Sequence, residues 1–248
     1  MSDSVLMIMN ARELPECINP LRKLEIDKVW FRAFPQVQVE KEIRRFVKSN
    51  AYDRYLLVSD DAIVSRESLE SVLRWQDNYD ILTGWCNLSP SRFRANVILH
   101  PLKKVSYFRL GSRMPRFLGR HLAGLVSGGV FPFKHLYERV AFNSFPSYSD
   151  INRLPEVFET FFMGGPLLSM SGEHWLKYNF KSPSWGGPAL GADMALSEQI
   201  ANDGLRMWCV RDAFCYHLHT TRNFLVGRVD PEVIHIHTRP AQELRSDS

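Results

Sequence analysis

The sequence predicts an α/β fold: a mostly parallel central sheet with flanking helices, in a single domain spanning residues 1–248. Apolar stretches rich in strand formers alternate with stretches whose apolar residues have helical spacing. The stretch at 55–58 runs directly into two adjacent carboxylates, Asp60 and Asp61. In sheets of this kind ligands bind beyond the carboxyl ends of the strands. The chain has 248 residues, 45% of them hydrophobic and 23% charged, which suits one domain with a sizeable core.

The first third of the chain contains most of the expected parallel strands. The run at 5–9 is apolar throughout, as in a strand buried on both faces, and a polar loop at 10–12 follows it. Ser65 is expected to be the N-cap of a helix. Expected strands cover residues 5–9, 26–31, 55–58 and 79–85, and expected helices cover 39–50 and 65–75.

The sheet pattern resumes at 159–170, where Gly164 and Gly165 interrupt it. Paired glycines let a ligand approach the backbone closely, so they are candidates for an acceptor-side loop. Helices are expected at 171–178, with Ser171 as N-cap, and at 191–202, ended by Gly204. Strands are expected at 205–210 and 213–219, separated by a turn at Asp212.

Residues 181–188 have loop composition and one large aromatic side chain, Trp185, followed by Gly186 and Gly187. A mobile active-site loop with an aromatic platform has this composition. An ordinary surface loop with Trp185 turned inward has it as well, and the two interpretations stay open.

The acid pair at the end of the 55–58 strand has two interpretations. Neighbouring carboxylates repel each other, and the usual remedy is a hard divalent cation shared with substrate phosphates. Aspartate is also a common turn and N-cap residue, so a hydrogen-bonded turn is the alternative.

Residues 81–137 hold nine lysines and arginines and no acidic residue, with aromatic residues between them. We expect a basic and aromatic insertion at 88–152, suited to an anionic membrane surface or a lipid-linked partner. The alternative is a loop whose aromatic residues pack on the core while the basic stems cover apolar surface.

Composition excludes several other classes. The net charge of +4 is too small to indicate a nucleic-acid partner. The four cysteines are scattered without a CxxC pair, which favours free thiols in a reducing compartment. No signal peptide is recognisable, and the run at 121–133 is too short to span a bilayer. We therefore expect a cytoplasmic protein. Peripheral association with the membrane is an alternative expectation.

Three parts of the chain resemble the GT-A fold nucleotide-sugar glycosyltransferases, especially the large family 2. The strand ending in Asp60 and Asp61 resembles their DXD-type metal motif, and residues 79–84 are similar to the strand that usually follows it. The most specific part matches the family's Glu-Asp motif, helix, G-[Y/W]-R strand and late histidine in order and spacing. It comprises Gly191, Ala192, Asp193, Gly204, Arg206, the Asp212-Ala213 turn and His217.

The resemblance covers most of the chain except about residues 88–152. It implies a GT-A, Rossmann-like domain that moves a sugar from a nucleotide-diphosphate donor, UDP- or GDP-linked, to an acceptor hydroxyl with inversion. The acceptor would be a saccharide, a lipid-linked molecule or a protein. Alanines stand at two positions, Ala62 and Ala192, where the family's motifs are usually acidic.

The resemblance also implies residue roles. Asp61, with Asp60 directly or through water, would hold Mn²⁺ or Mg²⁺, and His217 is a candidate third ligand. Asp193 is the candidate general base. A plain strand histidine and a plain N-cap carboxylate are the alternatives for the last two. The donor nucleotide would contact four positions: Asn10, Arg12, Asp27 and Asp60.

Two other functions remain open. A sugar nucleotidyltransferase normally carries a glycine-rich basic loop after the first strand, and residues 10–15 contain no glycine. A non-catalytic nucleotide- or sugar-binding protein on the same scaffold is compatible with Ala62 and Ala192. Metal-dependent hydrolysis of a nucleotide sugar separates an enzyme from a binding protein.

Overall fold

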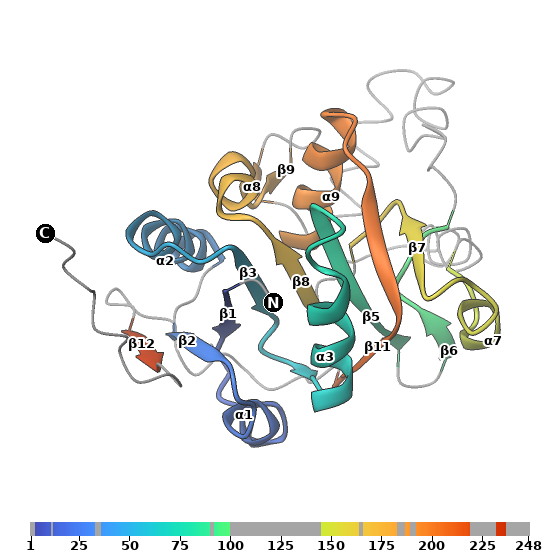
Figure 1. The fold of residues 1–248 in the computed structure, drawn as a ribbon, viewed down its shortest axis with the longest axis horizontal. Coiled ribbons are helices and arrows are strands. Elements are labelled where there is room, and N and C mark those ends of the chain that lie inside the picture. The colour runs from blue at the N-terminus through green and yellow to red at the C-terminus, as the bar shows by residue number, and fades with distance from the viewer. Residues whose placement is uncertain are drawn as a thin grey trace, which may run out of the picture.

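The protein folds around one mixed sheet with helices on both faces (Figure 1). The computed structural model describes residues 3–10, 12–32, 36–89, 92–99, 145–163, 166–182, 187–188, 192–218 and 232–236. The main path of the sheet runs in the order β12-β2-β1-β3-β8-β5-β11-β4, with β6 beside β5 and β7 beside β11.

The strands of this sheet are β1 (Ser4–Met9), β2 (Asp27–Arg32), β3 (Arg54–Val58), β4 (Ala62–Ile63), β5 (Ile81–Ser89), β6 (Arg92–Ala95), β7 (Val157–Thr160), β8 (Leu167–Met170), β11 (Met207–His217) and β12 (Glu232–Ile236). A separate two-stranded ribbon joins β9 (Lys181–Ser182) and β10 (Gly187–Pro188). The described helices are α1 (Pro15–Arg22), α2 (Gln36–Ser49), α3 (Arg66–Trp75), α7 (Tyr148–Ile151), α8 (Gly172–Lys177) and α9 (Ala192–Asn202).

The core of the sheet is mostly parallel, as the sequence predicts. β1 pairs in parallel with β2 and with β3, and β5 pairs in parallel with β11. β8 lies antiparallel between β3 and β5, so these two strands point the same way. The carboxyl ends of β1, β2, β3, β5 and β11 therefore lie along one edge of the sheet.

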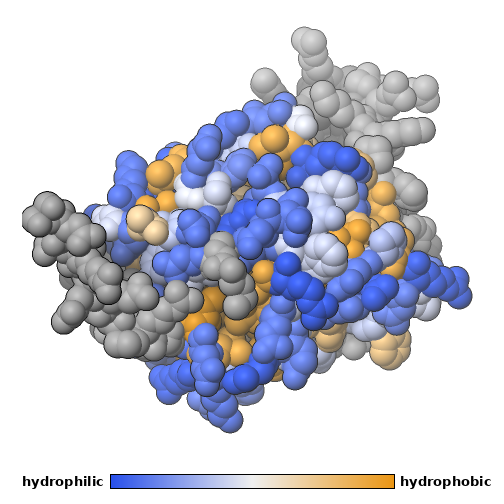
Figure 2. Space-filling model, in the orientation of Figure 1, coloured by the Kyte–Doolittle hydropathy of each residue, from blue (hydrophilic) through white to orange (hydrophobic). Residues whose placement is uncertain are grey.

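Two helical layers explain why the central strands are apolar on both faces. On β1, Val5 and Met7 pack in the cluster that includes residues of α2, α8 and α9. The intervening Leu6 and Ile8 pack in the cluster with α1 and α3. A strand between two layers buries every side chain, and β3 is likewise buried along its whole length. On the face shown in Figure 2 most side chains are hydrophilic, with small apolar patches between them.

Local sequence signals place several helix starts correctly. Ser65 accepts a hydrogen bond from the backbone of Ser68 at the start of α3, and Ser171 does the same for His174 in α8. Gly204 has φ 73° directly after α9, the left-handed conformation that glycine adopts without penalty. The α1 helix was not predicted, because Pro15 and Pro20 mask its pattern; Pro15 occupies the tolerated first turn.

The expected turn at Asp212 is wrong. β11 is continuous from Met207 to His217, and its pairing with β5 shifts register between Cys209 and Phe214. A bulge absorbs extra residues in a strand without ending it, and the sequence pattern around a bulge looks like a break.

The described ends of the expected insertion at 88–152 belong to the domain. Ala95, Val97 and Ile151 are buried in a third apolar cluster with Trp85 and Phe158. β6 pairs with β5, and α7 packs beside β6. Residues 100–144, where most of the basic residues occur, lie outside the described part of the chain. Within the part that is described, no helix is long and apolar enough to cross a membrane.

Candidate functional site

The acid pair lies in the turn between β3 and β4, at the carboxyl edge of the parallel strands. β4 pairs antiparallel with the end of β11, which sets Ala62 opposite His217. The backbone NH of Leu218 donates to the carbonyl oxygen of Asp61 at 2.9 Å. This short strand therefore joins two segments that are more than 150 residues apart in sequence, as the numbering shows.

His217 reaches the acid pair, as the sequence predicts. Its Nε2 lies 3.0 Å from Oδ2 of Asp61. Asn87 of β5 fixes the histidine backbone from the other side: its Oδ1 accepts from the His217 NH at 2.7 Å, and its Nδ2 donates to the His217 carbonyl at 3.0 Å. Asn87 is a positioning residue that the sequence did not indicate. The available signal was a buried amide near the carboxyl end of an expected strand.

Arg12 approaches the acid pair from the loop after β1. Its Nη1 donates to Oδ2 of Asp61 and lies 3.4 Å from Oδ1 of Asp60. The three side chains are only 16%, 12% and 14% exposed for Arg12, Asp60 and Asp61. Water therefore screens these charges much less than it screens a surface ion pair.

The loop that carries Arg12 is anchored on both sides. The NH of Asn10 donates to the carbonyl of Phe31 at 2.9 Å, and Asn10 is buried. Glu13 has φ 51°, a left-handed conformation that is uncommon for a residue with a side chain, and its carboxylate pairs with Arg32. Leu14 is buried at the start of α1. These anchors hold the backbone on either side of Arg12.

The two carboxylates differ in their electrostatic environments. Burial raises the pKa of Asp60 to about 6, against the lowering effect of Arg12. Burial also acts to raise the pKa of Asp61, but the hydrogen bond and charge of His217, together with Arg12, more than offset it and lower that pKa. Oδ2 of Asp60 is buried and accepts no hydrogen bond from any described residue.

Asp193 lies in the first turn of α9 and is partly buried. Burial is the main cause of the raised pKa of the Cys86 thiol. The neighbouring Cys215, Asp61 and Asp193 raise it further. One buried thiol on β5 thus lies within electrostatic reach of both Asp61 and Asp193.

The structure does not bring Asp27 to the acid pair. It is the first residue of β2, where it pairs in register with Val5, and its carboxylate accepts a hydrogen bond from the Tyr52 hydroxyl at 2.9 Å. Asn10 follows Met9, which pairs with Phe31 at the other end of the same ladder. The two ends of the ladder are four residue steps apart, about 13 Å.

The predicted acceptor-side loop is mostly outside the described residues. Gly164, Gly165, Trp185 and Gly186 all fall there. Gly187 is described as the first residue of β10, paired with Ser182 of β9.

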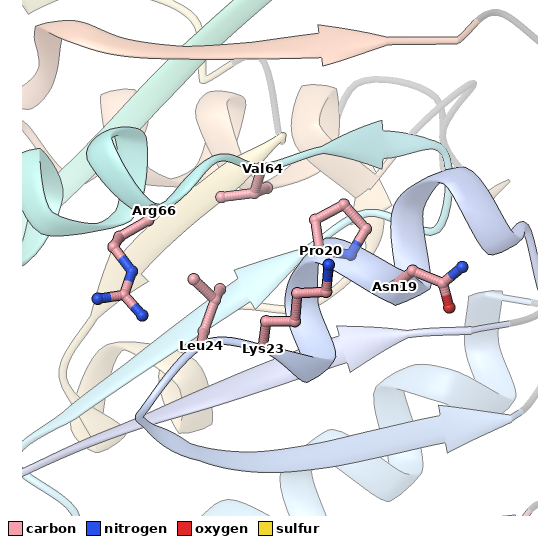
Figure 3. A pocket seen from close by; sticks show the side chains of 6 residues that line it. All are labelled: Asn19, Pro20, Lys23, Leu24, Val64 and Arg66. Atoms are coloured by element: carbon pink, nitrogen blue, oxygen red, sulfur yellow. The ribbon is translucent and has the colours of Figure 1, made fainter.

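Two hollows on the described surface lie away from the acid pair. One of about 390 Å³ lies between α1 and the start of α3 (Figure 3), lined by Asn19, Pro20, Lys23, Leu24, Val64 and Arg66. The other, of about 400 Å³, lies between β11 and α7, lined by Trp85, Tyr148, Asn152, Arg211, Asp212 and Phe214. Neither includes a site residue that the sequence predicts.

The acid pair offers the donor types that a divalent cation prefers. No group of three or more His, Cys, Asp or Glu side chains in the described ranges is arranged to hold a metal ion. Asp60 and Asp61 nevertheless offer carboxylate oxygens beside the His217 imidazole, a set that suits Mn²⁺. The buried and unsatisfied Oδ2 of Asp60 is an acceptor that such an ion could satisfy.

Comparison with known proteins supports the fold and nothing finer. No protein-family model matches the chain, and no curated protein matches it. Among solved structures the chain is similar to the crystal structure of A197 from STIV, with 14% sequence identity and a TM-score of 0.50. The match covers 91% of this chain and 94% of that one. At this identity the likeness concerns the α/β fold alone.

Proposed function

We propose that this protein is a metal-dependent GT-A glycosyltransferase that moves a sugar from a UDP- or GDP-sugar to an acceptor hydroxyl. One observation carries the proposal: Asp60, Asp61, His217 and Arg12 meet at the carboxyl edge of the parallel strands. Ligands of α/β sheets bind at this edge, and acidic residues near a basic one suit a metal-bound diphosphate.

Charge at the leaving group is the main chemical problem. When the sugar leaves, negative charge grows on the nucleotide diphosphate. A Mn²⁺ or Mg²⁺ ion held by Asp61, Asp60 and His217 would supply Lewis-acid stabilisation of that charge. Arg12 can donate parallel hydrogen bonds to phosphate oxygens, since a guanidinium matches phosphate geometry. Asn10, at the base of the same loop, would shape the nucleotide side of the site.

Asp193 is assigned as the general base. Its carboxylate would take the proton from the acceptor hydroxyl as that oxygen attacks the anomeric carbon. A base on the face opposite the leaving diphosphate inverts the configuration at that carbon. Within α9 the Ser197 hydroxyl donates to the backbone carbonyl oxygen of Asp193 at 2.7 Å.

The acceptor is proposed to lie at an anionic surface. The basis is the acid-free composition of residues 81–137, with nine basic residues among aromatic ones. Each lysine or arginine near an anionic membrane contributes about 1 kcal/mol to binding. A saccharide on a lipid phosphate, or an acceptor displayed on such a membrane, would be concentrated there.

A non-catalytic donor-binding protein is the second candidate. The residue after the acid pair, Ala62, has no carboxylate to offer a metal ion. It is fully buried in β4 opposite His217. Such a protein would bind a nucleotide sugar without hydrolysing or transferring it. A sugar nucleotidyltransferase is disfavoured by the glycine-free loop at 10–15.

Thermal stabilisation by nucleotides tests the proposal. UDP, GDP, ADP and CDP would each be added to the full chain with Mn²⁺ or with chelator. Binding to the folded state raises the melting temperature by mass action. We expect UDP or GDP to stabilise the protein only when Mn²⁺ is present, and the matching nucleotide sugar to be hydrolysed slowly. Stabilisation without hydrolysis favours the binding protein, and no response to any diphosphate contradicts both.

A further inference from the structure

The Arg12 guanidinium lies between the carboxylates of Asp60 and Asp61. A single nitrogen, Nη1, contacts Oδ2 of Asp61 and lies 3.4 Å from Oδ1 of Asp60. Two carboxylates from consecutive residues thus share one cationic group. The remaining oxygen of Asp60 is buried without a described partner, so the neutralisation that Arg12 provides is incomplete.

Contacts of the loop on both sides of Arg12 hold it in this position. Glu13, the next residue, has φ 51° and pairs with Arg32, while Asn10 is hydrogen-bonded to Phe31. Residues kept in sparsely populated backbone conformations are maintained by their surroundings and concentrate at sites with a function. A flexible surface arginine would need none of these anchors.

We propose that Arg12 is a tethered cation that competes with the divalent ion for Asp60 and Asp61 until the nucleotide diphosphate arrives. This inference rests on the proposed metal site. Arg12 and the ion repel each other, so both cannot neutralise the pair at close range. The diphosphate brings new negative charge, and the arginine moves to its oxygens and leaves the carboxylates to the ion.

The consequence is coupled binding. The ion alone binds weakly, because it must displace a preset ion pair. The diphosphate alone meets an arginine that is already engaged. Each ligand removes the obstacle to the other, and this coupling is reciprocal by thermodynamic necessity. An enzyme built this way binds its ion mainly together with its donor.

Titration of the full chain with Mn²⁺ alone tests the inference directly. Calorimetry, or the electron paramagnetic resonance signal of free Mn²⁺, would compare wild type with Arg12→Gln. Arg22→Gln is the matched control, since it removes the same charge from the exposed last turn of α1. We expect Arg12→Gln to bind Mn²⁺ on the order of ten-fold more tightly than wild type, a typical coupling. The control should stay within about two-fold of wild type, since exposed charges are well screened.

A second measurement does not depend on binding isotherms. In chelator, Arg12→Gln should melt at a lower temperature than wild type, because two poorly solvated carboxylates lose their counter-charge. Mn²⁺ should restore the melting temperature of the variant and leave that of wild type nearly unchanged. Addition of UDP or GDP should increase the Mn²⁺ affinity of wild type more than that of the variant.

The outcomes separate this inference from the proposed function. Equal or weaker Mn²⁺ affinity in Arg12→Gln overturns the competition and leaves the proposed metal site intact. Absence of Mn²⁺ binding in both proteins, with and without UDP or GDP, overturns the competition and the metal site together. If Arg22→Gln binds Mn²⁺ more tightly by the same factor as Arg12→Gln, the gain in affinity comes from the lower net charge alone, and the inference is also overturned.

Discussion

Asp60 and Asp61 are consecutive residues, yet the pKa values of their carboxyl groups are shifted in opposite directions. Burial raises the pKa of Asp60 to about 6, whereas Asp61 is buried to a similar degree and has a lowered pKa. The difference lies in hydrogen bonds, because both Arg12 and His217 donate toward Oδ2 of Asp61. Such divergence marks sites where neighbouring acids have different roles. Asp61 stays ionised at neutral pH and is the stronger candidate for direct ion contact.

Replacing Asp61 by asparagine should abolish metal-dependent donor binding and turnover. The substitution keeps the size of the side chain and removes the charge that faces Arg12 and His217. Isothermal titration with UDP and GDP in Mn²⁺, together with nucleotide-sugar hydrolysis, measures both effects. Asp203→Asn, at an exposed ion pair with Lys177, is the control and should behave as wild type. Full activity of Asp61→Asn, or of wild type in excess chelator, would remove the metal from the mechanism.

Replacing Asp60 by asparagine should stabilise the metal-free protein more at neutral than at acid pH. The folded-state pKa of Asp60 is about 6 against a reference of 3.8, so the folded state binds more protons than the unfolded state between these values. Wild-type stability therefore falls as pH rises through that window, and the full cost persists above pH 6. The shift corresponds to about 3 kcal/mol at pH 7, a figure that already includes the attraction of Asp60 to Arg12.

Urea unfolding in chelator at pH 4 and pH 7 measures this difference between Asp60→Asn and wild type. Asp203 is the matched control, since hydrogen bonds from Lys177 and Tyr178 lower its pKa. Its titration then lies almost wholly below pH 4, so the stability difference between Asp203→Asn and wild type should stay nearly constant from pH 4 to pH 7. If the stability difference between Asp60→Asn and wild type did not depend on pH, burial would not raise the pKa of the Asp60 carboxyl group.

Replacing Asp193 by asparagine should slow transfer by on the order of 10²–10⁴ with donor affinity retained, the usual range for a general base. The Ser197 hydroxyl bonds to the Asp193 backbone carbonyl, so this support survives the change. Glu198→Gln, on the same helix, is the control. Single-turnover rates and donor titration separate the two effects. A collapse of donor affinity in Asp193→Asn would place the residue in the nucleotide site or in the fold.

Replacing Gly84 by alanine should destabilise the protein by about 1–3 kcal/mol, the usual cost of overpacking. A Cβ atom there would lie 2.6 Å from the carbonyl oxygen of Ala213, on the adjacent strand at the β11 bulge. Gly172→Ala is the control, because its nearest neighbour is a Tyr55 ring carbon at 3.1 Å rather than backbone. Urea midpoints compare the two. Equal midpoints would mean that β11 shifts freely at its bulge.

The basic segment should bind anionic vesicles in a salt-sensitive way. Sedimentation with phosphatidylserine-containing and with neutral vesicles, at low and high salt, measures the effect. We expect binding only to the anionic vesicles and its loss at high salt, since screening weakens exposed charge interactions. Equal binding to neutral vesicles, or none to anionic ones at low salt, would contradict a membrane-binding role for residues 81–137.

The sequence alone determined the features that depend on neighbouring residues. The apolar run of β3 and its acid pair, the Ser65 and Ser171 caps and the Gly204 stop all follow from residues within a few positions. The sequence also shows that Asp27 lies near the start of the expected strand at 26–31. The start of a parallel strand lies at the edge of the sheet opposite the carboxyl ends. Asp27 could have been excluded from the site on that ground.

Tertiary structure decided what the acid pair contacts. Arg12 lies 49 positions from Asp61, and Asn87 lies 130 positions from the His217 backbone that it holds. These contacts require the sheet order and the register of β4 against β11. The pairing of β11 with β5 contains the bulge that the sequence presented as a turn at Asp212. The charge and the structural propensity of a residue can be read from the sequence. The distances between residues and their burial are set only when the sheet packs. The opposite pKa shifts of Asp60 and Asp61 depend on those distances and on that burial.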